Sequence, residues 1–335
     1  MASAGSSSPT ISVVLPVRNE GRFIGSVLQE LAEQDFPHED YEVIVVDGES
    51  TDDTIAIASQ YRDRFDRFQI IENPRRLSSV ARNLGLRAAT GEFILYVDGH
   101  CRIPSMCLLT DMAAIFRRNS VDTLCRPQPQ TAGPQTYFQQ AVSQARASAL
   151  GHALDSTIYG DQERRVPAAS SGAMYRRDVF YKIGEFDERF DACEDVEFNT
   201  RIDKAGLKAM ISPRLTIEYA ARTSLRGLFR QLYRYGYGRW RLFCKHPATL
   251  GIGTLIPALF VLGLFALPFA WLVSLKAGLI VSVPYVFYLI IISAVSLGIA
   301  HKHRKSLIFI LPFIFFTIHL AFGTGFIAAL ARLQR

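Results

Sequence analysis

The chain has 335 residues, of which 49% are hydrophobic and 20% charged, and its formal net charge is +6 at pH 7. Its last acidic residue is Glu218, so residues 1–221 sum to −7, whereas residues 222–335 contain 13 Lys and Arg and sum to +13. A single soluble fold rarely separates charge so completely. The overall basicity belongs to one part of the chain and gives no reason to expect a nucleic-acid partner.

The cysteines and the N-terminal residues indicate the cellular compartment of the protein. Five cysteines are scattered, with no CxxC pair and no histidine at zinc-finger spacing, which is typical of free thiols in a reducing compartment. Residues 1–10 are small and polar and lack an apolar stretch. We therefore expect a disordered N-terminus without a cleavable signal peptide, and a soluble part that stays in the cytoplasm.

Short apolar runs alternate with amphipathic stretches from Ile11 onward. Strands are predicted over 11–17, 41–47, 67–71 and 92–98, and helices over 23–31, 55–61 and 80–86. This alternation predicts βαβ units and an open α/β sheet, which binds ligands beyond the carboxyl ends of its strands. Polar residues fall at those ends, namely Arg18, Asn19, Glu20, Asp47 and Asp98.

The pattern is looser after residue 120. A strand is expected over 122–128, a helix over 135–154, and a strand leading into a short helix over 170–177. The helix predicted over 194–205 ends at Gly206, and residues 207–219 are expected to close the sheet.

The C-terminal part reads as a membrane domain over residues 250–335. Segments 252–275 and 277–300 are uncharged, and 306–331 contains His319 as its one ionisable group. Each is long enough to cross a hydrocarbon core, which takes about 20 residues. The basic run 301–305 marks a cytoplasmic loop, so three spans place the catalytic part in the cytoplasm and the tail outside. Arg332 and Arg335 in that tail oppose this topology.

A basic linker, residues 222–248, joins the two parts. Arginine recurs every four residues at 222, 226, 230 and 234, beside an apolar face that includes Leu228 and Leu232. This pattern predicts an amphipathic helix in the membrane interface, with its arginines near anionic headgroups; an ordinary solvated helix is the alternative.

Acidic residues at strand ends suggest metal and phosphate chemistry. Asp47 ends one strand, and Asp98, followed two residues later by His100, ends another; Glu194 and Asp195 form a later pair. Side chains placed in this way can hold Mg²⁺ or Mn²⁺ against substrate phosphates. A strand-end Asp taken alone would more often only cap a helix.

Five segments, taken in order, resemble the family 2 glycosyltransferases: VVLPVRNE (13–20), VVDGESTDDT (45–54), ARNLGLRAATGEFILYVDGH (81–100), SSGAMYRRDVF (170–180) and FDERFDACEDVEFNTRIDKAG (186–206). The resemblance covers residues 11–206 and implies a GT-A fold, a mixed α/β sheet domain expected over 11–221. With QLYRYGYGRW (231–240) and the apolar segments, the chain is similar to the membrane-anchored subgroup that builds bacterial exopolysaccharides such as succinoglycan.

The resemblance also implies roles for particular residues. Asp47 would accept a hydrogen bond from the base, Arg82 would approach the donor phosphates, and Asp195 would be the general base, with Glu194 beside it. Asp98 and His100 would occupy the DxD metal motif; His in place of the usual Asp suits Mn²⁺ better than Mg²⁺, unless Asp98 acts alone. The remaining donor-site residues are Pro16, Val17, Arg18, Glu20, Ser50 and Gly99, and Ser171 and Gly172 would face the acceptor.

The expected reaction is a single displacement. A base removes the acceptor hydroxyl proton while that oxygen attacks C1 opposite the diphosphate, which inverts the anomeric centre. The donor is expected to be a nucleotide sugar, with uridine the preferred nucleotide. The expected acceptor is a polyprenyl-diphosphate-linked saccharide at the bacterial cytoplasmic membrane.

The stretch after the sheet domain resembles the QxxRW acceptor motif of processive synthases, with Gln231, Arg234 and Tyr235 in order and Trp240 nearby. Acceptor binding and anchoring at the membrane interface remain equally open for its aromatic residues. Three spans are few for a polymer channel, which favours transfer of one sugar. A polyprenyl-phosphate glycosyltransferase is a competing interpretation, although DGHCRIPS (98–105) lacks the DADLQHPP-like stretch of those enzymes. An inactive membrane scaffold is a weaker one.

Overall fold

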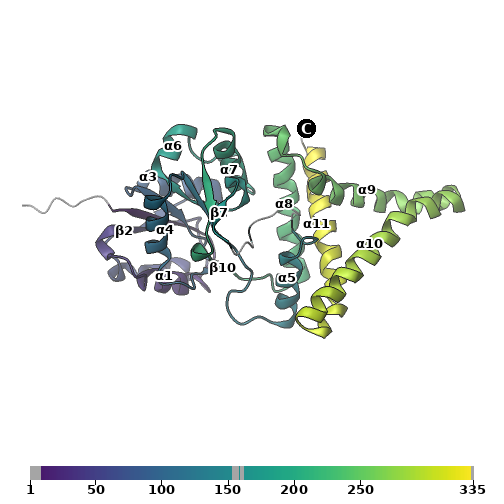
Figure 1. Cartoon of the computed structure of the whole chain (residues 1–335), viewed down its shortest axis with the longest axis horizontal. Coiled ribbons are helices and arrows are strands. Elements are labelled where there is room, and N and C mark those ends of the chain that lie inside the picture. The colour runs from purple at the N-terminus through teal and green to yellow at the C-terminus, as the bar shows by residue number, and fades with distance from the viewer. Residues whose placement is uncertain (1–8, 153–157, 159–161, 333–335) are drawn as a thin grey trace, which may run out of the picture. The chain divides into compact units, whose positions relative to one another are not determined.

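The computed structural model of the chain describes residues 9–152, 158 and 162–332. The chain divides into two compact units (Figure 1), one built from Met1–Gly133 and Thr157–Ala220 and the other from Pro134–Ser156 and Ala221–Arg335. The segment around α5 (Tyr137–Ala147) therefore interrupts the first unit in sequence and belongs to the second.

The first unit is built on an eight-stranded mixed sheet with the order β3-β2-β1-β4-β8-β6-β9-β7. Strands β1, β2, β3 and β4 are parallel neighbours, whereas β8 runs antiparallel to β4 and β6. The strands are β1 (Ile11–Val17), β2 (Tyr41–Asp47), β3 (Phe68–Glu72), β4 (Phe93–Tyr96), β6 (Thr123–Cys125), β7 (Arg164–Arg165), β8 (Gly172–Arg176) and β9 (Ala209–Ile211). A separate pair joins β5 (Cys101–Arg102) to β10 (Glu218–Tyr219).

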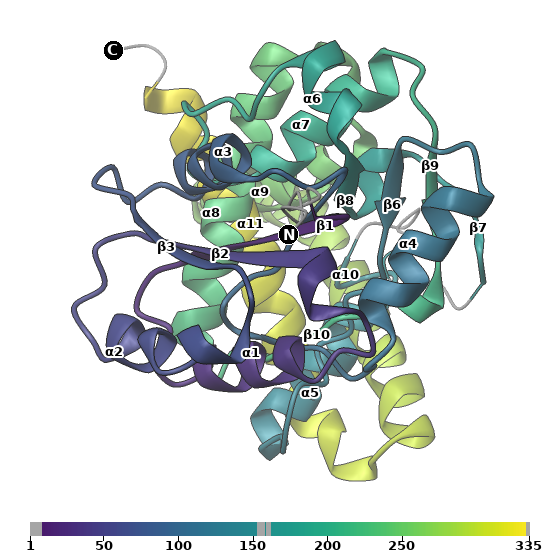
Figure 2. The same cartoon turned by 90° about the vertical axis from the view of Figure 1, so that its left-hand side faces the viewer.

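Helices cover both faces of this sheet, as Figure 2 shows end-on. One face packs against α1 (Ile24–Ala32), α2 (Thr54–Ser59) and α4 (Leu108–Arg118), and the other against α3 (Ser78–Ala88), α6 (Arg177–Ile183) and α7 (Glu194–Lys204). Because both faces are covered, central strands such as β2 are buried along their whole length, which explains their unbroken apolar sequences.

The predicted GT-A-like mixed sheet is confirmed, and the bounds of β1 and β2 match the expected 11–17 and 41–47. Helix α4, whose apolar side chains recur at helical spacing, was not predicted. The helix expected over 135–154 ends at Ala147, and residues 153–154 lie outside the described part of the chain.

The second unit contains α5, α8 (Leu225–Lys245) and three long apolar helices: α9 (Ile252–Val273), α10 (Leu275–Lys302) and α11 (Leu311–Arg332). All three are long and apolar enough to cross a membrane. One apolar core joins residues of α5, α8, α10 and α11, among them Ala141, Leu232, Ile292 and Phe315. The chain therefore ends in a helical unit suited to membrane association.

Candidate active site

The site lies at the carboxyl edge of the parallel strands. β1 ends at Val17, which pairs in register with Asp47, the last residue of β2. On the other side of β1, β4 ends at Tyr96, and Asp98 follows two residues later. The topology thus brings two of the predicted acids to one edge of the sheet, on either side of β1.

The carboxylate of Asp47 organises the loop that follows it. Its Oδ2 accepts the backbone N–H of Ser50 at 2.9 Å, and its Oδ1 accepts the Ser50 hydroxyl at 2.5 Å. The Ser50 hydroxyl oxygen in turn accepts the N–H of Asn19, which has a positive φ of 56°. Asp47 and Ser50 therefore fix the two loops together, and binding of a base by Asp47 stays a prediction.

Gly99 allows the turn after β4 to approach the turn after β1. A Cβ at Gly99 would lie 2.8 Å from Cγ1 of Val17 and 3.0 Å from Cγ of Glu20, so a larger residue would push the turns apart. Pro16 is half-buried in β1, and Arg18 is exposed just beyond it. The predicted donor-site residues at the end of β1 and just after it therefore lie at the carboxyl edge of the sheet: Pro16, Val17, Arg18 and Glu20.

Arg82 of α3 connects the two acidic groups that were predicted to share the site. Its guanidinium lies 3.4 Å from Oδ1 of Asp98 and 3.4 Å from Oε1 of Glu194. Ser78 donates its hydroxyl to the same Glu194 oxygen at 2.7 Å. Arg82 is therefore paired with both Asp98 and Glu194, and the charge of Asp195, the second residue of α7, also raises the pKa of the Arg82 guanidinium.

Burial and charge act in opposite directions on these groups. Burial alone would lower the pKa of the Arg82 guanidinium, but Asp98 and Glu194 raise it above its ordinary value. Burial would raise the pKa of Asp98, but Arg82, His100 and Arg126 hold it below the usual range. For Glu194 burial prevails, so its pKa is raised despite Arg82.

Two aromatic rings make cation–π contacts with the guanidinium of Arg82. Its guanidinium carbon lies 5.1 Å from the ring centroid of Tyr96 and 5.6 Å from that of Phe186. The Tyr96 hydroxyl donates to the backbone carbonyl of Arg82 at 3.2 Å. A guanidinium fixed in this way is a preformed positive site for a phosphate group.

Two residues that were not predicted complete the surroundings of Asp98. Tyr219 donates its hydroxyl to Oδ2 of Asp98 at 2.8 Å, and Arg126 donates to the Tyr219 hydroxyl at 2.9 Å. Arg126 is 2% exposed and also donates to the carbonyl of Tyr96 at 2.7 Å. The position of Arg126 at the end of β6 was the one sequence signal for it, since strand ends at this edge carry the site.

His100 is oriented by Glu20. Its Nδ1 lies 3.0 Å from Oε1 of Glu20. A carboxylate on the second nitrogen is the usual partner of a metal-binding histidine. The carboxylate of Asp98 and an imidazole fit Mn²⁺ when phosphate and water oxygens complete the coordination. Among the described residues, no cluster of three His, Cys, Asp or Glu side chains forms a metal site of its own.

Of the predicted acceptor residues of the first unit, Gly172 begins β8 and Ser171 directly precedes it. Gly172 is buried, and its carbonyl accepts the amide N–H of Asn199 at 2.9 Å and the hydroxyl of Tyr175 at 2.8 Å. A Cβ at Gly172 would lie 2.7 Å from Oδ1 of Asn199. Ser171 is also buried, at 8% exposure. These contacts give Gly172 a role in packing β8 against α7.

The other predicted acceptor residues lie on α8, in the second unit. Gln231 donates to the hydroxyl of Tyr235 at 3.2 Å, and the Tyr235 ring is exposed. Trp240 packs instead against Phe243 and against Phe326 of α11, with ring centroids 5.2 and 5.1 Å apart. Arg234 is exposed one residue before Tyr235. Of the two candidate aromatic residues, Tyr235 is the more accessible.

Known proteins are similar to this chain over most of its length. The succinoglycan biosynthesis protein ExoA of Rhizobium meliloti is 30% identical over 77% of this chain and 77% of its own length. A Methanococcus voltae protein, the dolichyl N-acetyl-alpha-D-glucosaminyl phosphate 3-beta-D-2,3-diacetamido-2,3-dideoxy-beta-D-glucuronosyltransferase, is 24% identical over 96% of this chain and 97% of its own length.

A solved structure has a similar fold. The mannosyltransferase PcManGT from Pyrobaculum calidifontis, determined with GDP-Man and Mn²⁺, superposes with a TM-score of 0.60 at 21% identity, over 97% of this chain and 88% of its own. The sequence profile of "Glycosyl transferase family 2" matches residues 12–184. The chain therefore belongs to glycosyl transferase family 2, whose members transfer sugars from nucleotide sugars.

Proposed function

We propose that this protein moves one hexose from a nucleoside diphosphate sugar to a lipid-linked saccharide, with inversion at the anomeric carbon. UDP-glucose is the first donor to test. The observation that carries the proposal is the pairing of Arg82 with both Asp98 and Glu194 at the carboxyl edge of the sheet, with Asp195 next to Glu194 in α7. This pairing supports a site in which a cation meets the donor phosphates close to a metal-binding carboxylate.

The donor side depends on positive charge. Arg82 is held in place by two carboxylates and two aromatic rings, so it can meet a diphosphate without reorganising. Asp98 and His100 would hold Mn²⁺ or Mg²⁺, which when bound supplies further positive charge to the leaving diphosphate. Asp47 and Ser50 stand on the other side of β1, where the base of the nucleotide would lie.

The acceptor side depends on Asp195. Its Oδ1 accepts the N–H of Val196 at 2.8 Å in the first turn of α7, which keeps the carboxylate at the helix terminus. We assign it as the base that takes the proton of the acceptor hydroxyl during attack on C1. Glu194 is buried against Ser78 and Arg82, so we assign it the positioning of Arg82.

Two relatives support a lipid-linked acceptor and polysaccharide synthesis. The Methanococcus voltae protein is named for a dolichyl-linked sugar acceptor, and the Rhizobium meliloti protein for succinoglycan biosynthesis. We therefore propose that a polyprenyl-diphosphate-linked saccharide is the acceptor, at the cytoplasmic face of a bacterial inner membrane. Gln231, Arg234 and Tyr235 are the candidate acceptor contacts of α8, and Trp240 supports that helix from within its own unit.

Transfer can be measured directly with the detergent-solubilised full chain and Mn²⁺. Labelled UDP-glucose, UDP-N-acetylglucosamine and GDP-mannose are each incubated with a polyprenyl-diphosphate-linked monosaccharide, and the lipid product is isolated. We expect one donor to label the lipid and the new linkage to be β by NMR. Asp195→Asn should lower the rate by about 10²–10⁴-fold, as expected for loss of a general base.

A matched control removes the same charge elsewhere. Asp178 is exposed on α6, and Asp178→Asn should keep the wild-type rate. Equal rates for Asp195→Asn and the wild type would refute the assigned base, and an α-linked product would refute inversion. Labelling of free polyprenyl phosphate in place of the saccharide would show the competing acceptor class instead.

A further inference from the structure

The apolar surface of the second unit is concentrated on two helices. Exposed large hydrophobic side chains run along α9 and α10 from Ile252 to Leu297, whereas α11 exposes only Phe313, Phe316 and Leu330 among its described residues. In the most apolar stretch of α11, 44% is buried within the protein, against 17% for α9 and 11% for α10. Protein therefore covers α11 to a much larger extent than it covers α9 or α10.

Helix α8 provides much of that cover through very close backbone packing. A Cβ at Gly236 of α8 would lie 2.0 Å from the carbonyl oxygen of Phe322, and a Cβ at Gly325 of α11 would lie 2.0 Å from that of Tyr233. The two helices run side by side in both cartoon views (Figures 1 and 2). Leu228 and Leu232 share one apolar core with the first half of α11, so the contact extends along most of both helices.

The outer face of α8 is strongly basic. Arg226, Arg230 and Arg234 are exposed on it, and α8 contains no acidic residue. If α11 crossed the hydrocarbon core, its partner α8 would enter with it and carry these arginines to membrane depth, which is highly unfavourable. The same arginines are well placed in a layer of anionic headgroups.

The packing of α9 against α11 is also unlike that of three consecutive spans. In an up-and-down arrangement the second half of α11 would lie beside the end of α9. Instead, a Cβ at Gly323 would lie 2.1 Å from the carbonyl oxygen of Pro257, near the start of α9. In Figure 1, α9 and α10 meet at their far ends and diverge toward α11, which runs across the open end of this hairpin.

We propose that α8 and α11 lie together along the headgroup layer of an anionic bilayer and that the α9–α10 hairpin alone enters the hydrocarbon. The residues that follow α11 then emerge on the face of the membrane that carries α8. Length and composition allow three spans, but the hairpin carries most of the exposed apolar surface that immersion requires.

The distribution of charge agrees with this arrangement. If α11 lies at the interface, the order of the chain puts twelve of the thirteen Lys and Arg residues after position 221 on the α8 side, and Lys276 at the tip of the hairpin is the exception. A spanning α11 would place Arg332 and Arg335 on the opposite side. The interfacial α11 therefore satisfies the positive-inside rule better.

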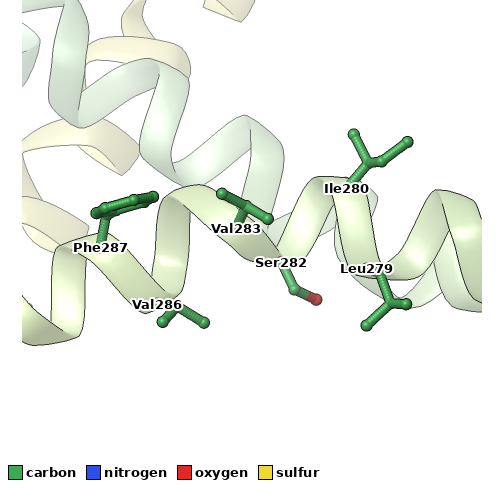
Figure 3. A pocket seen from close by; sticks show the side chains of 6 residues that line it. All are labelled: Leu279, Ile280, Ser282, Val283, Val286 and Phe287. Carbon is green, nitrogen blue, oxygen red and sulfur yellow. The ribbon is translucent and has the colours of Figure 1, made fainter.

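The hairpin also offers a surface suited to acyl chains. An apolar hollow of about 420 Å³ on α10 is lined by the six residues shown in Figure 3, Leu279, Ile280, Ser282, Val283, Val286 and Phe287. The single polar side chain in it, Ser282, donates its hydroxyl to the carbonyl of Gly278 at 2.7 Å. Because the Ser282 hydroxyl is already hydrogen-bonded, an acyl chain can fill the hollow without supplying a polar group.

Depth measurements on spin-labelled protein test the proposal. The full chain is reconstituted in vesicles of phosphatidylethanolamine and phosphatidylglycerol, with exposed Cys107 and Cys244 changed to Ser, since the other three cysteines are buried. Labels replace Phe313 and Leu330, which are about 25 Å apart along α11. We expect both labels at the same shallow depth. A control pair on α9, at Leu259 and Leu272, should differ strongly in depth.

Sidedness gives a second measurement that does not depend on cysteine variants. Epitope tags are placed before Met1 and after Arg335 of the full chain, and protease is added to vesicles of known orientation. We expect both tags to be cut from the same side. Tags cut from opposite sides, or labels at Phe313 and Leu330 lying near opposite surfaces, would overturn the proposal whether or not the protein transfers sugar.

Discussion

The hydroxyl of Tyr219 donates a 2.8 Å hydrogen bond to Oδ2 of Asp98 and accepts one from buried Arg126. Tyr219, itself held by Arg126, thus fixes the orientation of the carboxylate that we assign to the metal. Tyr219 lies on β10, whose backbone pairs with β5 just after Asp98. This backbone pairing holds the Tyr219 side chain next to the Asp98 carboxylate. The orientation of Asp98 is therefore set before any ligand binds.

Replacing Tyr219 with Phe should weaken metal use more than it weakens folding. The change leaves Arg126 and Asp98 each without one partner, at a cost of about 1–3 kcal/mol. We expect the concentration of Mn²⁺ that gives half-maximal transfer to rise about 5–30-fold. A titration of activity with Mn²⁺, beside a melting curve, separates the two effects. Unchanged Mn²⁺ dependence with a lower melting temperature would show a purely structural role.

Arg82 should be indispensable to the sheet domain as well as to donor binding. Arg82→Gln removes the cation from buried Glu194 and half-buried Asp98 and should lower the free energy of unfolding by about 3–5 kcal/mol. Arg82→Lys keeps the charge but loses the fit to both aromatic rings, so we expect a smaller loss and a raised KM for the donor. Denaturant melts and donor titrations check both variants.

A second arginine of the same helix serves as the control. Arg87 pairs with Glu185, but its side chain is 56% exposed. Arg87→Gln should change the free energy of unfolding by less than about 1 kcal/mol, as is typical of surface ion pairs. A loss as large as that of Arg82→Gln would contradict the importance we give to burial.

Acidification should reveal the opposite shifts of Asp98 and Glu194. The pKa of Asp98 is lowered in the folded protein, so Asp98 stabilises the fold above its unfolded pKa of about 3.9 and loses this effect as pH falls further. The pKa of Glu194 is raised, so its contribution is greatest at low pH and is lost as pH rises through the folded value. The melting temperature of Asp98→Asn should therefore approach that of the wild type below about pH 4, and fall short of it near pH 7. A constant difference between the two across this range would contradict the assigned shift.

Two glycines should be essential to the pairing of α8 and α11. Gly236→Ala and Gly325→Ala each place a Cβ about 2.0 Å from a backbone carbonyl oxygen, so the helices must separate. We expect each change to cost about 1–3 kcal/mol, which thermal melts in detergent will show. At Gly298 of α10, nothing in the part of the chain that the structure describes lies within 4 Å of the position a Cβ would take, so Gly298→Ala should be neutral or stabilising by up to about 1 kcal/mol.

Much of the sheet domain was predictable because its local signals are strong. The central strands are buried on both faces, so β1 and β2 are continuous apolar runs, and their last residues mark the site edge directly. Strand direction leaves no such mark, which is why the antiparallel course of β8 between β4 and β6 did not appear in the sequence. Helix α4 has apolar residues at helical spacing, so its presence could be predicted from the sequence.

The site was predictable only where a residue lies at a strand or helix end. Asp47, Asp98 and Asp195 do so, but Tyr219 reaches Asp98 across 121 residues, and its neighbours in sequence give no sign of this contact. Ser78 and Arg126 were missed for the same reason, since their roles come from tertiary packing. The grouping of α5 with the C-terminal helices was equally hidden, because its buried face is small: Ala141, Val142 and Ala145.

The place of α5 in the chain has a practical consequence for anyone who wants the sheet domain alone. A truncation before α8 would remove the helices that cover Ala141, Val142 and Ala145 while leaving α5 attached. The shortened polypeptide would carry a helix whose small apolar face has lost its cover, which favours association between copies. A soluble catalytic fragment requires two changes: the chain is ended before α8, and residues 134–156 are replaced by a flexible Gly-Ser linker.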